Sequence, residues 1–293
     1  MINLTLDDIT QMVWKYWNFK TACRSKFSRT EEAKKNRQLK DKYKGRRCFI
    51  VGNGPSILDQ NLKLLENEIV FVANEFWRTG KYREVKPDYY LFFDSFYFNQ
   101  GSAHYLMEEF NEFLCKNEHR PEFIVPLTAK EVVLKCFEWE KYMVYYLDKS
   151  LSFTDGYSRE YDITKPIPGV QNVVQYAILL ATYMGFKEVY MLGVEETNLL
   201  SLVESYIKNE SISRYAYEVE RDNPLKKMEN NLLQEQTLES RLESFARMFH
   251  LYREVYSFCQ RGGVKVYNCT PSSLVDSIPK KKYETLFDET FLH

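Results

Sequence analysis

The chain has 293 residues, of which 44% are hydrophobic and 16% aromatic, enough to bury one α/β domain with an appendage. We expect a cytoplasmic protein, because no segment is apolar enough to span a bilayer and no secretory signal is recognisable. The six cysteines include no Cys-X-X-Cys pair and the four histidines show no metal-ligand spacing. These patterns argue against a structural zinc site and predict reduced thiols and no bound metal.

The net charge of −1 conceals a strong asymmetry. Residues 1–47 carry thirteen Lys and Arg against five Asp and Glu, a formal +8, which leaves −9 for the remainder. We therefore divide the chain into a basic helical arm, residues 1–45, and an α/β domain, residues 46–293. Such an arm favours an anionic partner surface.

The arm is predicted to be an amphipathic helix, with Ile9, Met12, Val13, Tyr16 and Trp17 spaced for one face. Aromatic residues beside Lys and Arg are typical of segments that lie on an anionic membrane, so peripheral membrane contact is one expectation. A helix that packs on its own domain is the other. Nucleic acid is not expected, because no binding module is recognisable.

Seven short apolar segments alternate with helical ones, which predicts a Rossmann-like α/β fold: a parallel sheet with helices on both faces. They are residues 48–52, 69–73, 89–93, 123–126, 143–146, 189–193 and 264–267. In such sheets, ligands bind beyond the carboxyl ends of the strands. This predicts a site at the loops that begin at Gly52, Asn74, Asp94 and Gly193.

The first of these segments runs directly into the turn Gly52-Asn53-Gly54-Pro55-Ser56. Glycines let backbone N–H groups approach an anion, and Asn53 and Ser56 add short polar side chains, so this turn predicts a phosphate or nucleotide site. It is not a good dinucleotide fingerprint, because Ile57 replaces the third glycine. No Gly-Lys-Ser/Thr follows, which excludes a P-loop.

Three later segments complete the expected organisation. Residues 169–185 are almost wholly apolar and predict a buried central helix, whose start near Gly169 would offer N–H groups to a phosphate. Residues 194–226 are polar, aromatic and irregular, which predicts a functional lid. Apolar side chains at helical spacing from Leu238 to Tyr256 predict a core helix.

Six motifs in order then resemble a known family: Gly52–Ser56, Ala73–Phe76, Phe92–Phe98, Met184–Glu195, Tyr215–Glu218 and Asn268–Leu274. The series is similar to bacterial CMP-sialic acid sialyltransferases of the Campylobacter lipooligosaccharide type, and equally to the related DUF115 proteins of surface-polysaccharide clusters. The resemblance covers roughly residues 46–280. It implies a GT-A-like variant of the Rossmann fold with a lid that closes over a nucleotide-sugar donor.

The resemblance also implies site residues and partners. Donor-binding residues would be Gly52, Asn53, Gly54, Ser56, Asn74, Asp94, Gly169, Ser272 and Ser273. Tyr215 aligns with a lid tyrosine that donates to the leaving phosphate, and Tyr217 lies two residues further on. The implied reaction is metal-independent transfer of a sialic acid-like sugar from a CMP-activated donor to a cell-surface glycan or lipid-linked acceptor. A homo-oligomer is compatible with it.

The chain departs from the family pattern at two places, so the resemblance identifies neither the general base nor the sugar donor. The family's Thr-Ser-Gly donor loop is Ile167-Pro168-Gly169 here, and its lid histidine has no counterpart between residues 194 and 249. The carboxylates Glu195, Glu218 and Asp94 are therefore the candidates for the base, with Glu195 ahead because it follows a core strand. Two alternatives stay open: a pterin pyrophosphokinase-like enzyme of the same superfamily, and a non-catalytic nucleotide-binding docking protein.

Overall fold

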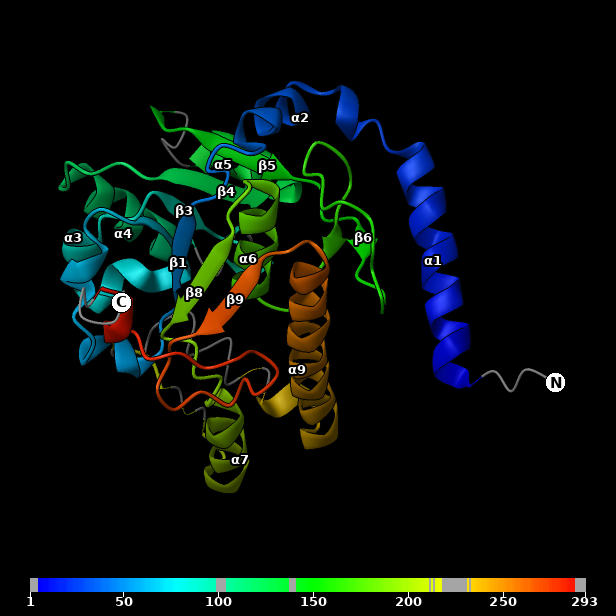
Figure 1. The fold of residues 1–293 in the computed structure, drawn as a ribbon. Helices are drawn as coiled ribbons and strands as arrows, with labels where there is room; N and C mark the ends of the chain where they lie inside the picture. Colours follow the sequence, from blue (N-terminus) through cyan, green and yellow to red (C-terminus); the bar gives the residue numbers. More distant parts are fainter. Residues whose placement is uncertain are drawn as a thin grey trace.

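The computed structural model describes residues 5–98, 104–136, 141–210, 212, 214–217, 231 and 233–287. At its centre lies a parallel sheet of seven strands in the order β5-β4-β3-β2-β1-β8-β9 (Figure 1). The strands are β1 (Arg47–Val51), β2 (Ile69–Ala73), β3 (Tyr89–Leu91), β4 (Glu122–Pro126), β5 (Val144–Leu147), β8 (Glu188–Leu192) and β9 (Lys265–Asn268). The predicted parallel α/β fold is thus confirmed.

The apolar strands are explained by burial on both faces of the sheet. In β1, Cys48 and Ile50 belong to one buried cluster, whereas Phe49 and Val51 belong to the cluster on the opposite face. Successive side chains of a strand point to opposite faces, so a strand covered on both sides needs apolar residues at every position. This is why the seven strands were recognisable as continuous apolar segments.

Helices cover both faces, as predicted. The first cluster includes side chains of α6 (Val173–Tyr183) and α9 (Leu238–Arg261). The second includes side chains of α3 (Tyr82–Val85), α4 (His104–Cys115) and α5 (Lys130–Cys136). Short 3-10 helices follow the first three strands, at Pro55–Leu58, Asn74–Thr79 and Ser95–Phe98.

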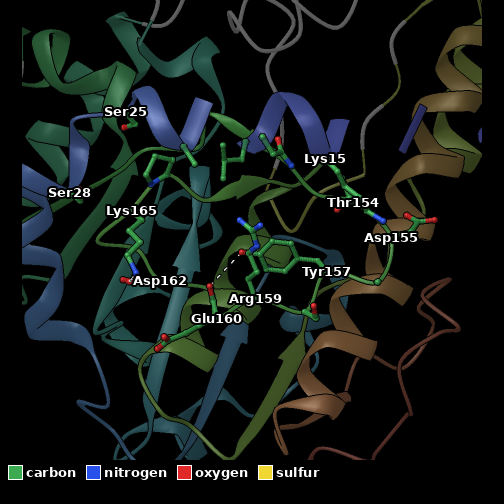
Figure 2. Close-up of a pocket in the computed structure, with 16 residues that line it drawn as sticks. Lys15, Ser25, Ser28, Thr154, Asp155, Tyr157, Arg159, Glu160, Asp162 and Lys165 are labelled. Carbon is green, nitrogen blue, oxygen red and sulfur yellow. Dashed lines mark hydrogen bonds and ion pairs between the residues drawn. The ribbon is translucent and has the colours of Figure 1, made fainter. Parts of the chain in front are cut away.

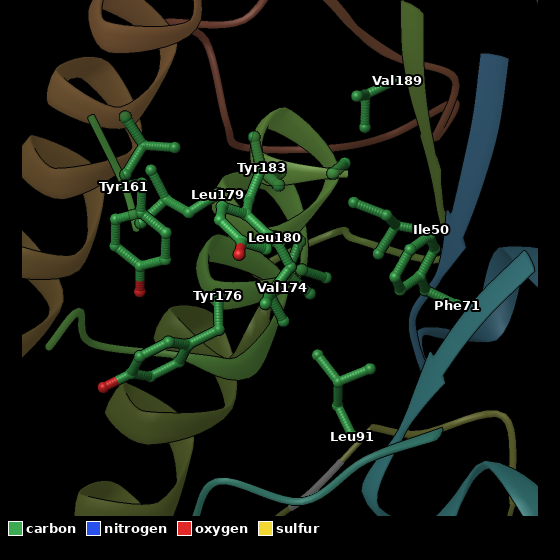
Figure 3. Packing of buried hydrophobic residues seen from close by; sticks show 14 of the residues in the cluster. Ile50, Phe71, Leu91, Tyr161, Val174, Tyr176, Leu179, Leu180, Tyr183 and Val189 are labelled. Atoms are coloured by element: carbon green, nitrogen blue, oxygen red, sulfur yellow. The ribbon is translucent and has the colours of Figure 1, made fainter. Parts of the chain in front are cut away.

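The predicted central helix is α6, and it is buried along almost its whole length. Figure 3 shows Val174 and Leu180 of this helix on the side that faces Ile50 and Phe71 of the sheet. Each fully buried aliphatic side chain of this kind contributes roughly 1.5–3 kcal/mol relative to an exposed one. The helix therefore anchors the sheet from which the site loops emerge.

The start of α6 differs from the prediction. The helix begins at Val173, and its N-cap Asn172 forms a capping box with Gln175. Gly169 lies before it in β7 (Pro168–Gly169), which pairs with β6 (Leu151–Ser152). The expectation that Gly169 opens this helix is therefore wrong, and the capping box already uses the first-turn N–H of Gln175.

The N-terminal arm consists of two parts. Helix α1 (Leu6–Arg24) stands beside the domain, whereas α2 (Glu31–Asn36) lies against it (Figure 1). Asn36 donates from Nδ2 to the carbonyl oxygens of Tyr146 at 2.8 Å and Ile163 at 2.9 Å, and Leu39 is buried. Residues 27–45, which the sequence analysis assigned to the arm, thus pack with the body.

Two further expectations need correction. Part of the predicted irregular lid is a regular helix, α7 (Asn198–Lys208). The predicted core stripe in α9 is buried only from Met248 onward, because Leu238 and Leu242 in its first turns are exposed. Among the described residues, no helix is both long enough and apolar enough to cross a membrane.

Candidate functional site

The glycine turn lies at the carboxyl edge of the sheet, where β1 and β8 are neighbours. The turn and the residues after β8 approach so closely that a Cβ added to Gly52 would lie 2.4 Å from the carbonyl oxygen of Gly193. The chain order reverses between these two strands, and such a switch point is where open α/β sheets bind ligands.

The N–H groups of this turn already have partners within the chain. Gly52 donates to Leu192 O at 2.8 Å, and Gly54 donates to Gly193 O at 2.9 Å. Ser56 N donates to the Glu195 carboxylate at 2.8 Å. The expectation that these three N–H groups receive a phosphate is therefore wrong, because carbonyl and carboxylate oxygens occupy the positions of the anion.

Glu195 fills the turn more fully than the sequence indicated. A Cβ on Gly54 would lie 1.4 Å from Glu195 Oε2 and 2.8 Å from the carbonyl oxygen of Gly193, so a larger residue at position 54 would displace the carboxylate and press on the backbone. The Glu195 side chain is 6% exposed. A buried carboxylate held against a backbone loop repels a second anion, so a bound phosphate would lie away from this turn.

Four side chains around the turn have a buried oxygen without a hydrogen-bond partner among the described residues. These atoms are Asn53 Oδ1, Ser56 Oγ, Asn74 Oδ1 and Glu195 Oε2. Buried polar atoms are rarely left unpaired, and leaving one so costs about 1–3 kcal/mol. Three of these four oxygen atoms can only accept hydrogen bonds, so they fit a ligand that has several hydroxyl or amino donors.

Backbone contacts hold the two asparagines in place. Asn53 donates from Nδ2 to Ala73 O at 3.1 Å, which ties the turn after β1 to the end of β2. Asn74 has a left-handed φ of 52°, and its carbonyl accepts from the Tyr90 hydroxyl at 2.7 Å. A non-glycine residue at positive φ is strained, and such strain is concentrated at functional sites.

A cavity of about 370 Å³ lies in the same region of the carboxyl edge. Its lining includes Asp94 after β3, Glu196 after β8, Tyr215, and Arg241 of α9. The cavity is linked to the glycine turn, because Ala216, next to Tyr215, donates its N–H to Asn53 O at 2.8 Å. The structure thus brings Asn53, Asp94 and Tyr215 together, as predicted.

Glu196 is the carboxylate that sequence reasoning missed. It accepts from the Tyr252 hydroxyl at 2.7 Å and from Asn172 Nδ2 at 2.9 Å, and its φ is 53°. Burial raises the pKa of Glu196, and the charge of Glu195 adds to this, against the two hydrogen bonds. The only signal in the sequence was its position beside Glu195 after a core strand.

The two tyrosines of the expected lid lie together. The rings of Tyr215 and Tyr217 stack with centroids 5.2 Å apart and an interplanar angle of 5°. Their side chains therefore point to the same side of the segment. Tyr215 is the one of the two that lines the cavity. Glu218 lies outside the described residues.

Two cations lie near this region. Arg241 lines the cavity, and Lys149 donates to Phe93 O at 3.0 Å. Burial lowers the pKa of Lys149, and the charge of Asp94 opposes this effect. Asp94 itself accepts from Phe96 N at 2.9 Å through Oδ1. Arg241 can therefore offer positive charge to a phosphate in the cavity, whose lining also includes the carboxyl groups of Asp94 and Glu196.

The remaining predicted donor-binding residues, Gly169, Ser272 and Ser273, are not part of the described lining of this cavity. Ser273 is buried, donates to Val194 O at 2.6 Å and accepts from Asn268 Nδ2 at 2.8 Å, so it joins the segments after β8 and β9. Ser272 is exposed. A Cβ on Gly169 would lie 3.0 Å from the Tyr176 hydroxyl. None of these three lines the 370 Å³ cavity among the residues that the structure describes.

No group of three or more His, Cys, Asp and Glu residues that could hold a metal ion occurs among the described residues.

The family of the chain follows from comparison with known protein families. Residues 25–196 match the family described as "6-hydroxymethylpterin diphosphokinase MptE-like". The matched region includes β1 to β8, the glycine turn, Asn74, Asp94 and both glutamates at its end. A search of curated proteins finds no match to the chain.

Proposed function

The chain belongs to the family of 6-hydroxymethylpterin diphosphokinase MptE-like proteins, and from this premise we propose that it is a nucleotide-dependent transferase acting at the carboxyl edge of the sheet. The observation that carries the proposal is the set of unpartnered acceptor atoms beside a cavity that holds a carboxyl of raised pKa. The two features suit the binding of a nucleotide ribose and the activation of an acceptor hydroxyl.

In this proposal, the ribose lies at the glycine turn. Its hydroxyl groups donate to Asn53 Oδ1 and Asn74 Oδ1, which supplies the hydrogen atoms that these acceptors lack. The Glu195 carboxylate keeps the phosphate away from the turn and directs it toward the cavity, where Arg241 and the Tyr215 hydroxyl meet it. Both groups then stabilise negative charge as the nucleotide leaves.

Glu196 acts as the general base. A carboxyl with a raised pKa is a stronger base than an ordinary one, and Glu196 lines the cavity where an acceptor would bind. Tyr252 and Asn172 hold its Oε1 in place. The base accepts the proton of the acceptor hydroxyl as that oxygen attacks the transferred group.

For the donor, we propose a CMP-activated sialic acid-like sugar, with a cell-surface glycan or lipid-linked oligosaccharide as acceptor. This rests on the resemblance of the six ordered motifs to CMP-sialic acid sialyltransferases. The reaction releases CMP and needs no metal ion, because Arg241 and Tyr215 neutralise the phosphate.

A second candidate, diphosphate transfer to a pterin-like hydroxymethyl group, is favoured by the family match. Its chemistry is similar to that of the sugar transfer, because in both reactions a hydroxyl attacks a nucleotide and a nucleoside monophosphate leaves. Such phosphoryl transfer uses Mg²⁺ held by carboxylates. The described carboxylates form no such group, since Glu195 is bonded to Ser56 N and Asp94 to Phe96 N.

The test is a thermal-shift screen of the full chain against CMP, UDP, GDP, ATP and NAD, followed by transfer assays. A ligand at 100 times its Kd stabilises the native state by about 2.7 kcal/mol. We expect CMP to give the largest shift, and transfer from a CMP-sugar to persist in EDTA. Preference for ATP together with Mg²⁺-dependent release of AMP would replace the sugar donor by the second candidate. No shift with any nucleotide would refute both.

A further inference from the structure

Helix α1 is attached to the domain through its polar side. Asn18 donates from Nδ2 to Ser152 O at 2.7 Å and accepts from Ser152 N at 2.8 Å, so its amide pairs with the backbone of β6. Gln11 accepts from Asp155 N at 3.1 Å. The ring of Trp14 lies 4.9 Å from the guanidinium of Arg247 in α9. At 100° per residue, positions 11, 14 and 18 share one face.

Helix α1 and the domain do not pack closely along their whole contact, and a cavity lies between them. The helix and residues 151–166 line a cavity of about 610 Å³ (Figure 2). Its lining includes Lys15 and Asn18 of α1, and Arg159 and Lys165 from the opposite wall. The loops that follow β1, β2, β3 and β8 contribute none of its described lining residues, so this cavity is separate from the candidate site.

The apolar side of α1 faces away from the domain. Large hydrophobic side chains on this side are 46–61% exposed: Ile9, Met12, Val13, Tyr16, Trp17 and Phe19. A helix packed on a globular core normally turns its apolar face inward and its polar face to water. Helix α1 does the reverse, so its apolar face needs a partner outside the described chain.

The charges beside this face indicate which partner fits. Five cations in and after the helix have no acidic partner among the described residues: Lys15, Lys20, Arg24, Lys26 and Arg29. Asp8 is engaged with Thr5 in the capping box at the helix start. Lys40 and Lys42 of the following segment are paired with Glu160 and Glu122. Lys15 lines the cavity between the helix and the domain.

At 100° per residue, Lys20 and Arg24 fall in the same sector of the helix as Val13 and Trp17. Positive charge without an acidic partner among the described residues therefore lies beside the apolar face.

We propose that the outward face of α1 docks on an anionic lipid surface. Aromatic side chains such as Tyr16 and Trp17 have the amphipathic character of residues at the headgroup level, and the cations meet lipid phosphates. The 19-residue helix would lie in the plane of the membrane along about 28 Å. A second copy fits less well, since pairing the same face of two copies would bring two positively charged helices together.

The test is flotation of the full chain with phosphatidylcholine vesicles containing 30% phosphatidylglycerol, and with phosphatidylcholine alone. We expect binding only to the anionic vesicles, weakened by salt. The double variants Tyr16→Ser/Trp17→Ser and Lys20→Glu/Arg24→Glu should each reduce partitioning at least tenfold. Matched controls are Ile207→Ser on α7, where the side chain is 78% exposed, and Lys116→Glu after α4, and both should bind normally.

Three results would overturn the proposal. One is failure of the wild type to bind anionic vesicles at low salt. Another is an equal loss of binding in the control variants, which would indicate a non-specific effect. The third is a wild-type dimer in solution that becomes monomeric in Tyr16→Ser/Trp17→Ser, since a second copy would then cover this face. Unchanged melting temperatures would show that the variants fold.

Discussion

The two edges of the sheet differ in how their polar groups are satisfied. At the amino edge, Arg47 donates from Nε to Glu68 at 3.0 Å, and Lys265 pairs with Glu188 at 3.3 Å. Lys42 donates to both Glu122 and the Tyr89 hydroxyl. At the carboxyl edge, by contrast, four side chains carry a buried oxygen without a partner among the described residues.

Backbone strain, by contrast, occurs at both edges. Asn74 and Glu196 follow β2 and β8 with φ angles of 52° and 53°, and Asp41 and Lys86, in the segments that precede β1 and β3, have φ angles of 54° and 46°. The two edges therefore differ in how their polar side chains are paired and not in strain. An unpaired buried oxygen costs stability, and in the proposed function the carboxyl edge retains these atoms for a ligand. Substitutions at matched positions test this difference.

The largest effect is expected from Glu196→Gln. Loss of the proposed base should lower kcat by about 10²–10⁴-fold, measured as transfer from the donor that the ligand screen identifies. In the wild type, activity should fall as the pH drops through the raised pKa of Glu196, and the variant should lack this acid limb. Glu188→Gln at the amino edge is the control and should leave kcat unchanged.

A separate prediction for Glu196→Gln concerns the stability of the folded protein. A carboxyl whose pKa is raised by folding stabilises the native state below its unfolded pKa, and this contribution is lost as the pH rises through the folded pKa. At neutral pH, the buried charge of Glu196 therefore costs stability, so Glu196→Gln should melt at a higher temperature than the wild type. A lower melting temperature together with normal kcat would make Glu196 a structural residue.

A smaller effect, on the order of 10²-fold in kcat, is expected from Tyr215→Phe. This change keeps the ring stacked on Tyr217 and deletes only the hydroxyl, so donor affinity should change little. Tyr217→Phe is the matched control, because Tyr217 does not contribute to the described cavity lining. Loss of turnover in Tyr217→Phe alone would assign the contact with the leaving phosphate to Tyr217.

The smallest effect is expected from Asn74→Gly. Glycine accepts the left-handed φ of 52°, so the variant removes the Asn74 amide without backbone strain. Nucleotide affinity, measured by calorimetry, should weaken about tenfold for one lost hydrogen bond. Asn209→Gly at the end of α7, where φ is 51°, is the control and should bind normally. Equal affinity in all three proteins would contradict the ribose contact.

Local sequence determined the sheet and the approximate place of the site. Apolar segments such as Ile69–Ala73 identified the strands because a strand buried on both faces must be apolar throughout. The polar residues that follow β1, β2 and β3 indicated the site because carboxyl ends of parallel strands meet at one edge. The Gly169–Gly185 segment likewise identified α6, although its capping box moved the helix start to Val173.

Only the tertiary structure shows which groups of the chain fill the glycine turn and surround the cavity. Ser56 N and the Glu195 carboxylate are 139 residues apart in sequence, so no local pattern indicates that this carboxylate fills the glycine turn. Burial and the charge of Glu195 raise the pKa of Glu196 against hydrogen bonds from Tyr252 and Asn172, which come from two other elements. The sequence likewise showed that α1 has an apolar face, whereas its direction was decided by the pairing of Asn18 with Ser152, a contact across 134 residues. Periodicity reports which residues share a face, and only long-range contacts decide what that face meets.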